Sequence, residues 1–189
     1  MIPSVILNIV IFAVNIVCTI VGLKKLEPKI LFRYFTVLSN LFCAAAAAIT
    51  AIAGAFGTLP LWVVLLKYTG TAAVTVTLLT VLLFLAPSSG EWKKLLSGPD
   101  LFWHLICPLL AIVSFCAFEH KTRFGFGWTL LGVLPVLLYG IFYFSRVVLA
   151  REENRMEDFY GFNKDGKWYL SVPLMLLGAF VISVVLWAV

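Results

Sequence analysis

The residues best suited to chemistry begin the second hydrophobic segment, in the run Arg33-Tyr34-Phe35-Thr36-Val37-Leu38-Ser39-Asn40. Thr36, Ser39 and Asn40 follow one another at offsets of three and four residues, so in a helix they share one face. That face carries two hydroxyls and an amide within an otherwise apolar segment. Polar groups at membrane depth are costly unless they have partners, so this cluster is a candidate functional site.

His104 is the one histidine inside a hydrophobic segment, and it precedes Pro108 by four residues. Proline has no N–H to bond with the carbonyl of residue 104, so a weakened helix and a kink are expected beside the imidazole. A neutral imidazole has one donor and one acceptor and titrates near neutrality, which suits a general base. The alternative is a structural histidine that bonds to a neighbouring carbonyl at the membrane interface.

Several other chemistries do not fit the spacing. His104 and His120 would lie about 24 Å apart along a helix, and no His or Cys cluster has zinc spacing. The acidic residues fall in loops or at segment ends, so no carboxylate pair is expected in the core. The sequence also lacks a glycine-rich phosphate loop and a G-x-S-x-G motif. We therefore expect no metal and no cofactor, which leaves a hydroxyl paired with a histidine.

Six hydrophobic segments must position these side chains. The 189 residues are 62% hydrophobic and 12% charged, with a mean hydropathy of +1.06, whereas soluble domains average about 25% charged residues. Because a helix needs about 20 apolar residues to cross a bilayer, the chain has room for six crossings and little else. We predict an all-α integral membrane protein in which residues 1–189 form a single six-helix domain with short loops. The predicted segments are 3–23, about 31–56, about 61–86, 101–118, about 126–149 and 168–189.

The basic residues predict the orientation in the membrane. Eleven Lys and Arg residues lie in or beside the loops after segments one, three and five, and only Lys121 and Arg123 lie on the opposite side. By the positive-inside rule both termini face away from the cytoplasm, and the first segment is expected to be retained as a helix. The net charge of +5 is thus explained by topology, and we expect no nucleic-acid partner.

This topology converts sequence positions into depths. Segments two and four both enter from the cytoplasmic side, so Thr36 and His104 are expected at a similar depth, with Asn15 and Tyr139 in the same half. Lys67 lies about 10 Å into the third segment, where it is expected to snorkel outward or to pair with Glu119.

The motifs resemble those of a known family. Arg33-Tyr34-Phe35-Thr36 with Asn40, followed in a later helix by His104-x-x-x-Pro108, is similar to the androgen-induced, androgen-dependent TFPI-regulating family of six-helix membrane proteins and its bacterial relatives. The likeness covers most of the chain and includes Glu119 and the stretch Glu157-Asp158-Phe159-Tyr160-Gly161-Phe162.

The resemblance implies a threonine hydrolase that cleaves lipid esters, notably fatty acid esters of hydroxy fatty acids. Thr36 would be the nucleophile and His104 its general base, with an acyl-threonine intermediate. The oxyanion would be stabilised by Ser39, Asn40 or a backbone N–H, and Asn15 and Tyr139 are further candidates for substrate binding. The partners would be the membrane and a lipid ester, and the short loops favour a bacterial inner membrane.

Two other readings remain open. The polar cluster can serve a non-catalytic lipid-binding or scaffold protein, in which Thr36, Ser39 and Asn40 bond to neighbouring helices. A small-solute transporter would also use proline-interrupted helices, but the sequence shows no internal symmetry between its halves. The sequence carries no signal for acyl-chain length, for the alcohol part of the ester or for the oligomeric state.

Overall fold

The computed structural model describes residues 2–120 and 124–189, and these residues form helices and connecting loops without a strand. Six helices are long and apolar enough to cross a membrane. This confirms the predicted all-α fold, and the chain is a multi-pass membrane protein. Lys121 and Arg123, which entered the prediction of orientation, lie outside the described residues.

Three of the six spans consist of more than one element. The first two and the last are single helices, α1 (Ile2–Lys25), α3 (Phe35–Ala55) and α10 (Trp168–Ala188). The third contains α4 (Leu61–Thr80), η1 (Val81–Leu85) and α5 (Ala86–Ser89). The fourth contains α7 (Gly98–Leu101), η2 (Phe102–Ile106), α8 (Cys107–Ser114) and η3 (Phe115–Glu119). The fifth contains η4 (Phe126–Thr129), α9 (Leu130–Phe144) and η5 (Ser145–Leu149). Short helices lie between the spans at α2 (Pro28–Leu31), α6 (Trp92–Leu95), η6 (Glu152–Asn154) and η7 (Lys164–Gly166).

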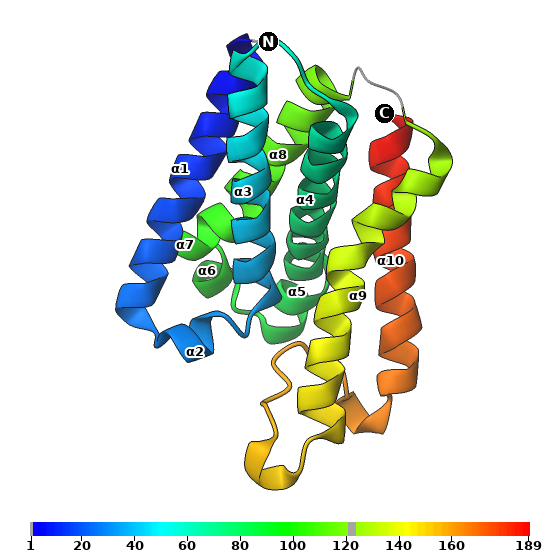
Figure 1. The fold of residues 1–189 in the computed structure, drawn as a ribbon. Coiled ribbons are helices and arrows are strands. Elements are labelled where there is room, and N and C mark those ends of the chain that lie inside the picture. The colour runs from blue at the N-terminus through cyan, green and yellow to red at the C-terminus, as the bar shows by residue number, and fades with distance from the viewer. Residues whose placement is uncertain (1, 121–123) are drawn as a thin grey trace.

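The third span forms the centre of the bundle. Figure 1 shows α1, α3 and α8 on one side of α4, and α9 and α10 together on the other. In the most apolar part of each span, 67% of the residues of the third are buried, against 22% in the fifth and 17% in the sixth. Both termini lie at one end of the bundle, and α2 and the segment 150–167 lie at the other, which we call the basic end.

Helix α3 packs closely on α4 through small residues. A Cβ added at Gly70 would lie 3.2 Å from the Cα of Cys43 and 3.3 Å from the Cβ of Ala46. Five alanines occupy positions 44–48 of this helix, and Ala44, Ala46 and Ala47 are buried. Small side chains let helix backbones approach each other in lipid, and the run therefore acts as a packing face.

Proline explains why the fourth span is irregular. Pro108 cannot donate to the carbonyl of residue 104, and the turn before it, η2, is π-helical. The span also begins earlier than the predicted Leu101, because Pro99 occupies the first turn of α7, where a missing N–H costs nothing. His104 therefore lies on an irregular turn, as the sequence predicted.

Candidate functional site

The predicted start of the second span is wrong, and this changes the position of Thr36. The chain forms α2 up to Leu31, turns through Phe32 and Arg33, and starts α3 at Phe35. Thr36 is consequently the second residue of α3 instead of lying a turn and a half inside it. Its side chain is buried, with 9% exposure, at the basic end of the bundle.

The Thr36 hydroxyl lies beside the phenol of Tyr160, which comes from the segment between the last two spans. The N–H of Phe35 donates to the Tyr160 oxygen at 3.0 Å. Burial raises the pKa of Tyr160, and hydrogen bonding from the Thr36 hydroxyl and from Phe35 opposes that rise. The first N–H groups of a helix have no partner within the helix, so the phenol oxygen satisfies one of them. Tyr160 thus covers the N-terminus of α3 and the candidate nucleophile together.

Asp158 holds the segment around Tyr160 in place. Its carboxylate accepts hydrogen bonds from the Tyr143 hydroxyl at 3.0 Å, the Phe162 N–H at 2.9 Å and the Asn163 N–H at 2.7 Å. The Tyr143 hydroxyl in turn accepts the N–H of Tyr160 at 3.2 Å. These bonds tie the segment around Tyr160 to Tyr143 over the basic end.

His104 is oriented by a backbone carbonyl. Its Nδ1 lies 2.7 Å from the carbonyl oxygen of Leu95, at the end of α6. A carbonyl only accepts, so Nδ1 carries the proton, and in the neutral ring Nε2 keeps a free lone pair. The imidazole is 7% exposed. This tautomer is the one that a general base acting through Nε2 requires.

Asn40 connects the turn that holds Thr36 with the turn that holds His104. Its Nδ2 donates to the Thr36 carbonyl at 2.8 Å and to the Trp103 carbonyl at 3.1 Å, and the side chain is fully buried. Val37 and Trp103 also pack in the same apolar cluster. The turn of α3 that holds Thr36 is therefore in direct contact with η2, which holds His104.

The two side chains themselves have different partners. Among the described residues, the Thr36 hydroxyl bonds with Tyr160 and the His104 Nδ1 with Leu95, and no hydrogen bond joins Thr36 to His104. In this arrangement the Thr36 hydroxyl is occupied by Tyr160.

The Ser39 hydroxyl forms hydrogen bonds with groups of α3 and α4. It donates to the Thr36 carbonyl at 3.1 Å and lies 2.9 Å from the Thr77 hydroxyl of α4. The Asn40 amide donor is likewise taken up by two carbonyls. Neither side chain has a donor directed at the Thr36 hydroxyl, which leaves the backbone N–H groups at the start of α3 as the available oxyanion donors.

The other two candidates lie in different places. Asn15 is fully buried in α1 and donates to the Ile11 carbonyl of its own helix at 2.9 Å. Tyr139 of α9 donates to the Arg33 carbonyl at 2.7 Å and packs its ring on Phe35, with 5.1 Å between the ring centroids. Tyr139 therefore borders the site, whereas Asn15 lies in the helix interior without a contact to Thr36 or His104.

Sequence reasoning missed two residues of this site. Asp100 precedes His104 by one helical turn and interacts electrostatically with it and with Lys25, so a carboxylate does lie near the imidazole. The spacing of four residues was a signal that could have identified it. Tyr160 carried no such signal, because its position depends on the path of a long connection.

A second polar network crosses the bundle near the end where the termini lie. The Glu119 Oε1 accepts hydrogen bonds from Ser4 at 2.6 Å, Asn8 at 2.7 Å and Ser114 at 2.7 Å. Lys67 Nζ donates to Asn8 Oδ1 at 2.6 Å and lies 3.9 Å from Glu119 Oε2, and the Lys67 and Glu119 side chains are fully buried. Of the two outcomes expected for Lys67, snorkelling outward and pairing with Glu119, the structure shows the pairing.

The described residues contain no group of three His, Cys, Asp or Glu side chains that could hold a metal ion. All four cysteines are free thiols within or beside the helix packing.

The fold and these polar clusters define the class of protein as a multi-pass α-helical membrane protein with a covered polar site at its basic end. Comparison of the chain with protein-family models, with curated proteins and with solved structures found no match.

Proposed function

We propose that the protein is an intramembrane hydrolase of lipid carboxylic esters, such as fatty acid esters of hydroxy fatty acids. Thr36 is the nucleophile and His104 the general base. The observation that carries the proposal is the bridge of Asn40 between the carbonyls of Thr36 and Trp103, because it ties the turn that bears the buried Thr36 hydroxyl to the turn that bears the imidazole. The similarity to the androgen-induced, androgen-dependent TFPI-regulating family supports the same assignment.

The reaction has two steps. In the first, His104 Nε2 takes the Thr36 proton while the threonyl oxygen bonds to the ester carbonyl carbon. The carbon–oxygen bond to the alcohol then breaks, and the alcohol leaves with the proton from His104. In the second, water gives a proton to His104 and attacks the acyl carbon of the acyl-threonine; the bond from that carbon to the threonyl oxygen breaks, His104 returns the proton to that oxygen, and the fatty acid leaves. A positioned base contributes about 10²–10⁴ in rate.

Under this proposal the substrate carbonyl binds where the Tyr160 phenol oxygen lies. Its phenol oxygen accepts the Phe35 N–H at 3.0 Å beside the Thr36 hydroxyl. The N-terminus of a helix favours negative charge, and its unpaired N–H groups suit an oxyanion. The ester carbonyl would replace the phenol oxygen, so that Phe35 donates to the developing negative charge.

A non-catalytic lipid-binding or scaffold protein is the second candidate. The observation that favours it is the set of partners in the covered state, since Ser39 and Asn40 bond across helices and His104 bonds to the Leu95 carbonyl. Under that function Thr36 would be a helix-packing residue. We also propose a bacterial inner membrane as the location, because most of the connections between the spans are short.

A tagged fluorophosphonate probe separates these functions. We expect it to label the wild-type protein in nanodiscs, and we expect labelling to disappear in Thr36→Ala and in His104→Gln while both variants elute as folded proteins. Thr75→Ala is the matched control, because Thr75 has a similar exposure of 8% but bonds to the Thr71 carbonyl of its own helix. Labelling that persists in Thr36→Ala, or that is lost equally in Thr75→Ala, contradicts the assignment of Thr36.

A further inference from the structure

A groove runs along the bundle between α3 and α9, with α4 at its base. It has a volume of about 450 Å³ and is lined by side chains that include Phe35, Leu38, Ser39 and Phe42 of α3. The spacing of these four positions is that of one helical face. Leu134 and Leu138 of α9 form the opposite wall.

The groove presents mainly apolar side chains to its occupant. Leu38, Leu134 and Leu138 are 38%, 41% and 59% exposed on the outside of a membrane-spanning bundle. The polar side chains of the groove have hydrogen-bond partners outside it: the Thr69 hydroxyl donates to the Leu65 carbonyl at 2.8 Å, and the Ser39 hydroxyl donates to the Thr36 carbonyl. An apolar groove that faces a bilayer is filled by lipid chains, since water has no polar partner there.

The length of the groove fits one leaflet. At 1.5 Å per residue, the wall from Phe35 to Phe42 rises about 10 Å and the wall from Phe142 to Leu134 about 12 Å. The hydrocarbon of one leaflet is about 15 Å deep, half of the bilayer core. An acyl chain lying along the membrane normal would therefore contact the groove over most of its length.

The groove ends beside the candidate nucleophile. The rings of Phe35 and Tyr139 line it toward its basic end, with centroids 5.1 Å apart. Ser39 lines the groove and shares a helical face with Thr36, one turn nearer the basic end. A chain in the groove thus has its polar end at the level of Thr36.

We propose that this groove, which we call the acyl groove, binds the fatty acyl chain of the ester and sets the preference for chain length. The proposal rests on the proposed function, since the acyl groove matters to catalysis only if Thr36 is the nucleophile. Each added methylene gains contact with the groove walls up to the chain length that reaches Phe42, so kcat/KM should rise with chain length over that range. Longer chains extend past the groove into the bilayer and gain little more.

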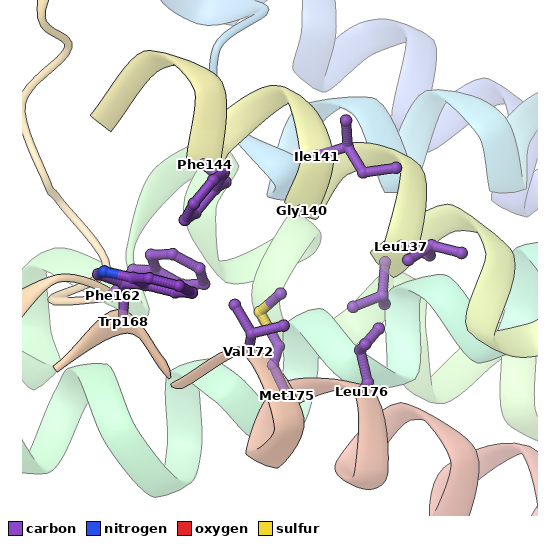
Figure 2. A pocket seen from close by; sticks show the side chains of 10 residues that line it. Leu137, Gly140, Ile141, Phe144, Phe162, Trp168, Val172, Met175 and Leu176 are labelled. Carbon is purple, nitrogen blue, oxygen red and sulfur yellow. The ribbon is translucent and has the colours of Figure 1, made fainter. Parts of the chain in front are cut away.

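A second groove provides the control. Figure 2 shows it between α9 and α10, where Phe144, Phe162 and Trp168 lie at one end and Leu137 and Leu176 toward the other. Its volume is about 240 Å³, and α3 contributes no residue to it. Leu137 and Leu138 are successive residues of α9 that point about 100° apart, into the control groove and the acyl groove respectively.

The first test measures binding directly. The full-length protein in nanodiscs is irradiated with a hexadecanoic acid that carries a diazirine, and labelled peptides are counted by mass spectrometry. We expect labels on residues of the acyl groove, reduced about tenfold in Leu138→Trp, where an indole fills the space. Labelling should be unchanged in Leu137→Trp and in Thr36→Ala. Equal losses in the two tryptophan variants, or no loss in Leu138→Trp, overturn the proposal.

The second test measures selectivity. We expect the kcat/KM ratio for hexadecanoyl over butanoyl nitrophenyl esters to fall at least about tenfold in Leu138→Trp and to stay constant in Leu137→Trp. A ratio that Leu138→Trp leaves unchanged, with hydrolysis still dependent on Thr36, contradicts the acyl groove alone. Hydrolysis that survives Thr36→Ala while the labelling behaves as expected contradicts the proposed function alone.

Discussion

Removing one member of the buried pair Lys67–Glu119 should destabilise the protein strongly. Both side chains are fully buried, and their charged atoms lie 3.9 Å apart. At an effective dielectric constant near 20, unit charges at that distance attract by about 4 kcal/mol. Lys67→Met leaves the Glu119 carboxylate without its counter-charge in the interior. We expect the free energy of unfolding to fall by about 3–5 kcal/mol.

The double variant distinguishes the pair from simple packing. In Lys67→Met/Glu119→Gln the amide oxygen of Gln still accepts from Ser4, Asn8 and Ser114, and no charge is left buried. We expect the double variant to lie within about 1–2 kcal/mol of wild type, so that the second substitution restores most of the stability lost by the first.

Unfolding in detergent micelles, by heat or by added denaturant, measures these differences. A loss of 3–5 kcal/mol corresponds to a decrease in Tm of roughly 6–20 °C for a chain of this size. Lys94→Met is the matched control, because Lys94 and Glu91 are only 3.0 Å apart but 74% and 51% exposed. It should leave Tm unchanged, although its pair is the closer one. A cost below about 1 kcal/mol in Lys67→Met, or additive losses in the double variant, would refute the reasoning.

Three further predictions concern the site and the helix packing. Burial raises the pKa of Tyr160 above its ordinary 10.0, so the phenol loses its proton at a lower pH in the unfolded chain than in the folded one. The stability of the wild-type protein should therefore fall above about pH 10, and by more than that of Tyr160→Phe. Measurements of Tm against pH test this. Gly132→Ala should cost about 1–3 kcal/mol in Tm measurements, because the added methyl overlaps the Ser183 side chain, whereas Gly127→Ala meets nothing within 4 Å and should be neutral. Asn40→Leu should lower the free energy of unfolding by about 1–3 kcal/mol, since it removes the donor between two buried carbonyls, and ester hydrolysis should fall with it. Wild-type activity in a folded Asn40→Leu variant would show that the bridge does not position the site.

Several features could be predicted from the sequence because they depend on composition and local spacing. Six crossings follow from the apolar segments, and the π-helical turn before Pro108 follows from one missing N–H. Thr69 and Thr75 bond to carbonyls of their own helix, as threonine in apolar helices commonly does. Lys67 forms an ion pair with Glu119 because a buried charge without a partner costs too much free energy, and few acidic residues lie at that level of the bundle.

The composition of the candidate site depended on contacts that no local pattern encodes. The break before Phe35, which moved Thr36 to the first turn of α3, comes from the turn through Phe32 and Arg33, and Arg33 is the one charged residue in the stretch 30–35. The contact of Asn40 with Trp103 spans 63 residues, and that of Phe35 with Tyr160 spans 125.

By itself, the sequence determined the number of spans, their apolar faces and the polar residues that needed partners. Only the tertiary structure decided which partners they found, and it set Tyr160 over Thr36 with the acyl groove beside them. The physical reason is that hydrophobic burial along a helix is periodic and can be counted residue by residue. The path of a connecting segment and the register between helices instead depend on how all the spans pack at once.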